Sequence, residues 1–156
     1  MYQSALPYPY LPEGRTFIYV PESDPFMSRA RDLWNRHDRY CKQATTAVIV
    51  KDGRIIGEGK NGGENPPAIC RRKELGCKTG EGYELCPGCD PKNHAEPSAI
   101  KNATEDIRGA DVYLYGHWWC CESCWQAMIS AGIRNVFLVE GATEKFFNGA
   151  AAPVKP

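Results

Sequence analysis

The stretch that decides the fold is HAEPSAIKNATEDIRGADVYLYGHWWCCESCWQAMISAG, residues 94–132. Apolar residues recur at helical spacing over 94–107 and again over 122–131, and a glycine follows each run at Gly109 and Gly132. Residues 111–116 between the two runs are typical of a strand. The order helix, strand, helix predicts a layered α/β domain in which strands pair in parallel across helical crossovers.

The flanking sequence extends this unit on both sides. Strand-like runs at 45–51 and 54–60 are joined by Asp52-Gly53, which is a strong hairpin signal, and a further strand is expected at 135–140. A helix is expected to begin after Asp24-Pro25, with apolar spacing that continues to Cys41. We therefore predict an α/β fold with a mixed sheet that contains an antiparallel hairpin and parallel pairs.

The chain divides into three parts. Residues 1–23 alternate tyrosine and proline and then form a β-rich run at 15–20, which predicts an extended arm followed by a strand at a vacant edge of the sheet. Residues 24–148 are expected to form the domain itself, with a Cys-, Gly- and Pro-rich insertion at 61–92. Residues 149–156 are expected to be a flexible tail.

Length and charge restrict the class of protein. The chain has 156 residues and a mass of 17.4 kDa, enough for one domain. Its 19 Lys and Arg balance 19 Asp and Glu, which disfavours nucleic acid and anionic membranes as partners and favours a small molecule. No secretory leader and no apolar run of about 18 residues is visible, so we expect a cytoplasmic protein without a membrane segment.

One histidine and two cysteines at helix starts form a candidate zinc site. His94 begins the first helix, and Cys121 and Cys124 lie three residues apart in the first turn of the second. Three ligands leave a tetrahedral zinc ion one open position, as in catalytic sites. Glu96 lies beside the expected metal without being a ligand, where it can take a proton from water activated by zinc and return it to a substrate nitrogen. Cys120 precedes the pair and is a competing ligand.

Two readings without catalysis stay open for these residues. They can be scattered buried thiols, or they can form a closed structural zinc knuckle, as in a non-catalytic, zinc-stabilised binding or assembly module. Glu96 discriminates between the readings, because a structural zinc ion has no need of an additional carboxylate.

A second group of cysteines lies in the insertion. Cys70, Cys77, Cys86 and Cys89 are predicted to bind a second, structural zinc ion that orders this long segment. Exposed thiols, or a disulfide between Cys86 and Cys89, are the alternatives.

The H-x-E and C-x-x-C motifs resemble those of the zinc-dependent cytidine and deoxycytidylate deaminases, although Cys120 stands where that signature has proline. Among them the chain is most similar to the deoxycytidylate (dCMP) deaminases. The resemblance includes Ala47-Val48-Ile49-Val50-Lys51-Asp52-Gly53-Arg54-Ile55-Ile56-Gly57, Asn61-Gly62, Leu75-Gly76, Gly80-Glu81, Glu84-Leu85-Cys86 and Ala131-Gly132-Ile133.

The resemblance implies a three-layer α/β/α sandwich and a homo-oligomer. It implies hydrolytic deamination of a cytosine nucleotide, dCMP to dUMP and ammonia, with His94, Cys121 and Cys124 as ligands and Glu96 as the proton shuttle. Asn61 would hold the sugar and the Ala95 backbone would contact the base. Cytidine, guanine, adenine in tRNA or a riboflavin-pathway pyrimidine are alternative substrates.

Two tryptophans before the cysteine pair leave the substrate open. Trp118 and Trp119 replace small hydroxyl residues common in the family, and Ser98 replaces its usual asparagine. Trp119 is the candidate for a wall of an aromatic base pocket, although a tryptophan more often belongs to the core.

Overall fold

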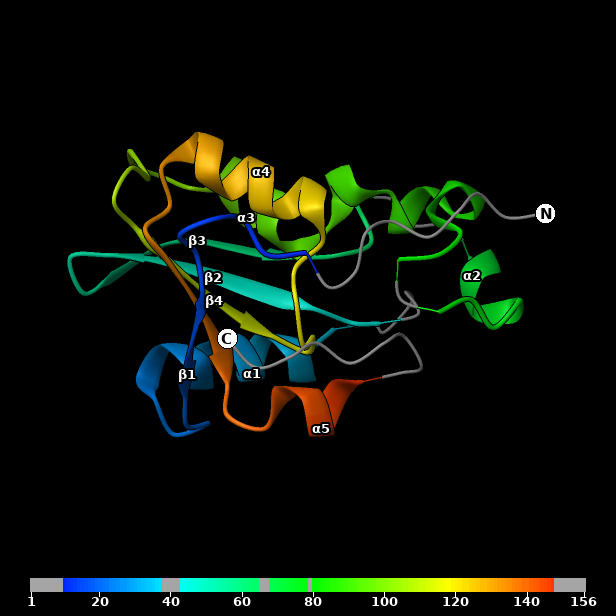
Figure 1. Cartoon of the computed structure of the whole chain (residues 1–156), viewed down its shortest axis with the longest axis horizontal. Coiled ribbons are helices and arrows are strands. Elements are labelled where there is room, and N and C mark those ends of the chain that lie inside the picture. Colours follow the sequence, from blue (N-terminus) through cyan, green and yellow to red (C-terminus); the bar gives the residue numbers. More distant parts are fainter. Residues whose placement is uncertain (1–9, 38–42, 65–67, 79, 148–156) are drawn as a thin grey trace.

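The chain forms a mixed five-stranded sheet with helices on both faces (Figure 1). The structure is a computed structural model, and it describes residues 10–37, 43–64, 68–78 and 80–147. The strands lie in the order β1-β5-β4-β2-β3. Their bounds are β1 Phe17–Val20, β2 Thr46–Lys51, β3 Arg54–Lys60, β4 Asp111–Tyr115 and β5 Asn135–Val139.

Parallel and antiparallel pairs divide the sheet as the sequence predicts. β2 pairs antiparallel with β3 and with β4, while β4, β5 and β1 are parallel to one another. Phe17 pairs with Val136 and Val20 with Val139, so the run at 15–20 occupies the sheet edge that we expected for it.

The helices make the sheet the middle of three layers. α1 (Pro25–Asn35) and α5 (Ala142–Phe146) cover one face, and α3 (Ala95–Lys101) and α4 (Glu122–Ala131) cover the other (Figure 1). Phe146 joins the two helices on the first face, because its ring lies 6.0 Å from Trp34 of α1 and 5.2 Å from Tyr115 of β4. The predicted α/β/α sandwich is confirmed.

α1 begins where the sequence indicates and ends earlier. The Asp24 carboxylate accepts hydrogen bonds from the backbone N–H groups of Phe26 and Met27 at 2.9 and 3.0 Å, which caps the helix. The helix ends at Asn35. Cys41, to which the apolar spacing extends, lies outside the described residues.

α3 is also shorter than the expected helix over 94–107, which is wrong beyond Lys101. After the helix, the Thr104 N–H donates to the carbonyl of Ile56 in β3 at 2.9 Å. This hydrogen bond to the sheet replaces the next turn of helix. The helix axis lies very close to β3, because the backbone of α3 passes over Gly57 and Gly59 with no room for a side chain.

The insertion forms short elements only. α2 (Arg71–Glu74) is followed by three 3-10 turns, η1 (Tyr83–Leu85), η2 (Pro87–Cys89) and η3 (Pro91–Asn93), which lead directly into His94. In the described part of the chain, no helix is both long and apolar enough to cross a membrane.

Candidate metal centre

Two helix N-termini bring the predicted ligands together. His94 is the cap residue of α3 and Cys121 is the cap residue of α4, so both side chains leave the backbone just before the first turn. The His94 Nδ1 atom lies 3.6 Å from Cys121 Sγ and 3.3 Å from Cys124 Sγ. The ligand atoms of the three residues all lie within 4.8 Å of one another.

These separations fit a zinc ion. Zn–N and Zn–S bonds of about 2.1 and 2.3 Å at a tetrahedral angle place nitrogen and sulfur about 3.6 Å apart. Both cysteines are buried, which excludes competing solvent from the thiolates. The donor set therefore matches the preference of zinc for nitrogen and sulfur, and three ligands leave a fourth position open.

The second ring nitrogen of His94 is held by the insertion. His94 Nε2 lies 3.1 Å from the carbonyl oxygen of Cys89. With the proton on Nε2 as donor, Nδ1 keeps its lone pair for a metal. The ring of Tyr83 meets the imidazole edge-on, with centroids 5.1 Å apart. Sequence reasoning missed both contacts, because a carbonyl carries no motif and Tyr83 lies eleven residues from His94.

Glu96 is enclosed beside the ligands. It is only 5% exposed, and burial raises the pKa of its carboxyl, with the nearby charge of His94 acting in the opposite direction. A hydrogen bond from Cys124 lowers the pKa of Cys121 to about 4, which favours the thiolate that a metal requires. A carboxyl with a raised pKa next to a metal-ligand cluster is suited to exchange protons near neutral pH.

Cys120 lies outside the group of three ligands. Its thiol is buried and hydrogen-bonded to the carboxylate of Glu96, and burial together with this carboxylate raises the pKa of the thiol. Cys120 thus faces Glu96, whereas Cys121 and Cys124 face His94.

Asn61 joins three segments beside the site. Its Oδ1 atom accepts from the Thr45 N–H at 3.0 Å and lies 2.8 Å from His37 Nε2, and its Nδ2 atom donates to the carbonyl of Gln43 at 2.7 Å. The next N–H, that of Gly62, donates to the carbonyl of Asn93, the residue before His94. Asn61 therefore ties the segment before β2 to His37, a structural role that the sequence did not reveal, and its neighbour Gly62 contacts the residue before His94.

The other two candidate substrate residues differ in their surroundings. Ala95 is fully buried in the first turn of α3, so only its backbone is suited to contact a ligand. Trp119 packs in the core: it is 3% exposed, its ring lies 4.6 Å from Phe17, and its indole N–H donates to the Tyr10 carbonyl. The geometry gives Trp119 the role of anchoring the segment before β1.

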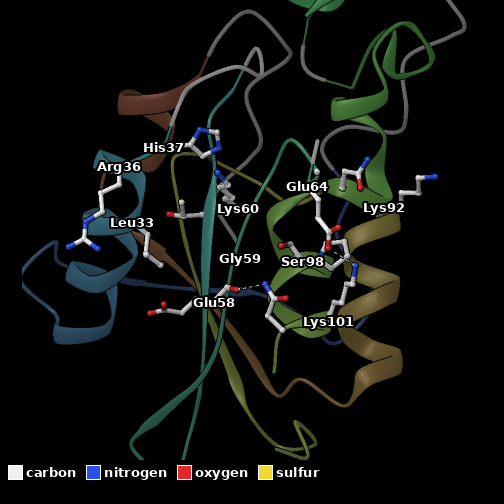
Figure 2. A pocket seen from close by; sticks show the side chains of 15 residues that line it. Leu33, Arg36, His37, Glu58, Gly59, Lys60, Glu64, Lys92, Ser98 and Lys101 are labelled. Atoms are coloured by element: carbon white, nitrogen blue, oxygen red, sulfur yellow. Dashed lines mark hydrogen bonds and ion pairs between the residues drawn. The ribbon is translucent and has the colours of Figure 1, made fainter. Parts of the chain in front are cut away.

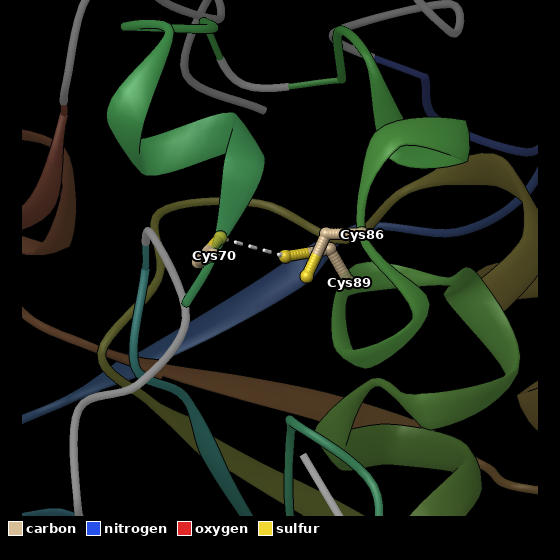
Figure 3. A group of neighbouring side chains, drawn as sticks. All are labelled: Cys70, Cys86 and Cys89. Carbon is tan, nitrogen blue, oxygen red and sulfur yellow. Dashed lines mark hydrogen bonds between the residues drawn. The ribbon is translucent and has the colours of Figure 1, made fainter. Parts of the chain in front are cut away.

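Three of the four cysteines of the insertion form a second cluster (Figure 3). Cys70, Cys86 and Cys89 are buried, their sulfur atoms lie within 4.8 Å of one another, and the Cys70 and Cys89 sulfurs are 3.6 Å apart. Cys77 is equally buried but is not brought into this group. Its sulfur lies instead against Gly82.

A cavity of about 460 Å³ lies between α1, β3 and α3 (Figure 2). Its lining includes the basic residues Arg36, Lys60, Lys92 and Lys101. The two glutamates in the lining are each paired, Glu58 with Arg29 and Glu64 with Lys101. The cavity also contains His37 and Asn93, so it adjoins both the Asn61 network and the loop that carries His94.

The comparisons with known proteins agree with this centre. Residues 21–140 match the cytidine and deoxycytidylate deaminase zinc-binding region, and the chain belongs to this family of zinc-binding deaminases. The matched range contains every ligand named above. No curated protein matches the chain.

Two solved structures of one dCMP deaminase show the same fold. The dCMP deaminase of cyanophage S-TIM5 in complex with dCMP and dUMP is 21% identical, with a TM-score of 0.53 over 76% of this chain and 82% of that one. The apo form of the same enzyme is 19% identical to this chain, with a TM-score of 0.50 over 78% of this chain and 86% of that one. RibD of Acinetobacter baumannii, form 1, gives 23% identity and a TM-score of 0.45 over 72% of this chain and 26% of that one.

Proposed function

We propose that this protein is a zinc-dependent hydrolase that converts dCMP to dUMP and ammonia. The observation that carries the proposal is the buried carboxylate of Glu96 beside three ligand atoms that fit one zinc ion. The S-TIM5 enzyme, which has the same fold, is a dCMP deaminase crystallised with dCMP and dUMP.

Each residue has a defined task in this reaction. His94, Cys121 and Cys124 would hold the zinc ion, which when bound supplies Lewis acidity and lowers the pKa of water. A C–O bond forms at C4 of the cytosine ring, and the C–N bond to the exocyclic amine breaks. Glu96 takes a proton from the attacking water and delivers it to the exocyclic nitrogen, which leaves as ammonia, and the remaining proton of the water passes to ring N3 to give the uracil. Its raised pKa suits a group that must hold a proton between these two transfers.

The reaction is tested by ammonia release from zinc-loaded protein with dCMP, CMP, deoxycytidine, cytidine, guanine and adenosine. We expect turnover of dCMP, and Glu96→Gln should lower kcat by about 10²–10⁴-fold while it keeps the bound zinc. Turnover of another compound would keep the mechanism and change the substrate. If the loaded protein deaminates none of them, or if Glu96→Gln stays active, the proposal is wrong and a non-catalytic zinc module is favoured.

We further propose that the basic cavity next to Asn61 receives the 5′-phosphate. Lys60 precedes Asn61 directly and lines the cavity together with Arg36, and a charge-assisted hydrogen bond to phosphate contributes about 1.5–3 kcal/mol. Lys60→Gln should therefore raise KM for dCMP about 10–100-fold and leave KM for deoxycytidine unchanged. The control is Lys51→Gln, on the neighbouring strand and outside the cavity. Equal effects on both substrates would exclude phosphate recognition here.

The second cysteine cluster supports a second zinc ion. Zinc–sulfur bonds of about 2.3 Å in a tetrahedral site separate two sulfurs by about 3.8 Å, whereas a disulfide bond is about 2.05 Å long. The 3.6 Å between the sulfurs of Cys70 and Cys89 fits the metal site. We propose Cys70, Cys86 and Cys89 as its ligands. A cytoplasmic location and a homo-oligomeric assembly stay predictions.

A further inference from the structure

The insertion and the candidate catalytic centre meet at one residue. Cys89 contributes its sulfur to the second cluster and its carbonyl oxygen to His94 Nε2. A change in the position of the Cys89 side chain therefore acts on the His94 imidazole through a single residue.

The backbone between them is stiff. The Cys89 N–H donates to the carbonyl of Cys86, the Asn93 N–H to Asp90, and the His94 N–H to Pro91, which gives two consecutive 3-10 turns. Each of these turns begins with a proline, which fixes one backbone dihedral in advance. The backbone from Cys89 to His94 therefore has few dihedral angles that can rotate freely.

Tyr83 forms a second path. Its ring packs against the cysteine cluster and meets His94 edge-on. The guanidinium of Arg72 lies 4.3 Å from the centre of the Tyr83 ring, and this arginine donates to the carbonyls of Lys78 and Glu81. The insertion therefore contacts the His94 ring from two sides.

The apolar core of the described part of the insertion is small. The buried apolar cluster of the insertion consists of Cys70, Cys86 and Cys89, with Tyr83 packed against it. Such a core buries too little surface to fix a long loop, whereas a metal bound by three thiolates would fix it.

We infer that metal binding by Cys70, Cys86 and Cys89 positions His94, so that occupancy of the second site strengthens metal binding at the His94–Cys121–Cys124 site. This inference rests on the proposed function in that both sites hold zinc. Groups that orient a metal-bound histidine typically contribute about 10–100-fold to metal affinity. By linkage, metal at either site strengthens binding at the other by the same factor.

The test measures zinc content and affinity of the full chain, with no need for turnover. The wild type should bind two zinc ions. Cys70→Ser removes a thiol and leaves the Cys89 carbonyl intact, so it should bind one zinc ion, about 10–100-fold more weakly in competition with a chromophoric chelator. Cys77→Ser is the matched control, because this buried thiol of the same insertion lies outside the cluster. It should bind two ions with wild-type affinity.

A second variant keeps all three thiols. Tyr83→Leu removes the edge contact with His94 together with the cation–π contact with Arg72, and should bind two zinc ions with the weaker one at the His94 site. Cobalt in place of zinc distinguishes the sites, because its charge-transfer bands report the number of thiolates. One metal ion in the wild type would overturn the inference, and so would undiminished affinity of the His94 site in Cys70→Ser and Tyr83→Leu. Absence of deamination with two coupled ions would contradict the proposed function alone.

Discussion

The contact between β3 and α3 predicts that one methyl group at Gly59 should disable the site. A Cβ atom there would lie 2.3 Å from the Ala99 nitrogen and 2.7 Å from the Ala95 carbonyl oxygen. These are backbone atoms, so no side-chain rotation relieves the overlap. Since ordinary contacts begin near 3.4 Å, α3 must move by about 1 Å, the difference between 3.4 and 2.3 Å. His94 and Glu96 lie at the start of that helix and would move with it.

Two quantities should change in Gly59→Ala. Overpacking of this kind lowers the free energy of unfolding by about 1–3 kcal/mol, or about 1 M in the urea midpoint at a slope of about 2 kcal/mol/M. A displacement of about 1 Å in a catalytic group lowers kcat about 10²-fold. The assays are urea unfolding followed by circular dichroism and ammonia release from dCMP.

Alanine substitutions at two other glycines of the same hairpin serve as comparisons for Gly59→Ala. Gly57→Ala places Cβ 2.7 Å from the Ala99 carbonyl oxygen, so its effect on kcat should be smaller. Gly53→Ala meets no atom within 4 Å but has a φ of +74°, so it should lower stability by about 1 kcal/mol and leave kcat unchanged. Wild-type kcat in Gly59→Ala, or equal loss in Gly53→Ala, would refute the argument from close approach.

Three further predictions concern the surroundings of the site. Asn61→Ala leaves the Thr45 N–H and the Gln43 carbonyl without their side-chain partner, so it should lower the free energy of unfolding by about 1–3 kcal/mol in urea titrations. An unchanged urea midpoint would show that these hydrogen bonds do not stabilise the fold. Trp119→Phe loses the hydrogen bond to Tyr10 and should lower stability by about 1 kcal/mol with kcat unchanged, whereas a large rise in KM would indicate a base contact. Hydrogen bonds from Lys145 and then Tyr115 lower the pKa of Glu22 below 4.5, so its contribution to stability is present above pH 4.5 and is lost as pH falls through the lower, folded-state pKa. Glu22→Gln should therefore be less stable than wild type in urea at pH 7, and the difference should shrink as the pH is lowered below 4.5; a difference that stays constant with pH would exclude ionisation of Glu22 as its cause.

Much of the fold follows from local patterns. The hairpin at Asp52-Gly53, the helix that ends at Gly132 and the strand at 135–139 have strong local signals, and the structure has them at those positions. The end of α3 depends instead on a hydrogen bond from Thr104 to Ile56, 48 residues away in the chain. A periodic apolar pattern cannot report such a contact. α5 was not predicted, since five residues after Gly141 are too few for a periodic signal.

Part of the candidate site also follows from local spacing in the sequence, and part of it does not. Spacing alone indicates that Cys121 and Cys124 share one helical turn, and a histidine at the start of the other helix completes the set. For the second cluster, spacing is a poor guide, because Cys70 and Cys77 lie on either side of a turn that directs only one sulfur to Cys86 and Cys89. Irregular loops have no fixed period, so the sequence names the candidate thiols without selecting among them.

Cys120 stands where the deaminase motif has proline, and its thiol contacts Glu96. Proline at this place has no donor group, whereas the Cys120 thiol is hydrogen-bonded to the Glu96 carboxylate and lowers the pKa that burial raises. A hydrogen bond to a carboxylate favours its charged form, the form that accepts a proton from water. Cysteine in place of proline therefore acts on Glu96 and leaves the candidate ligand set unchanged, because the sulfur faces Glu96 instead of His94. A residue next to a metal motif can thus change the pKa of a neighbouring carboxyl without joining the candidate ligands.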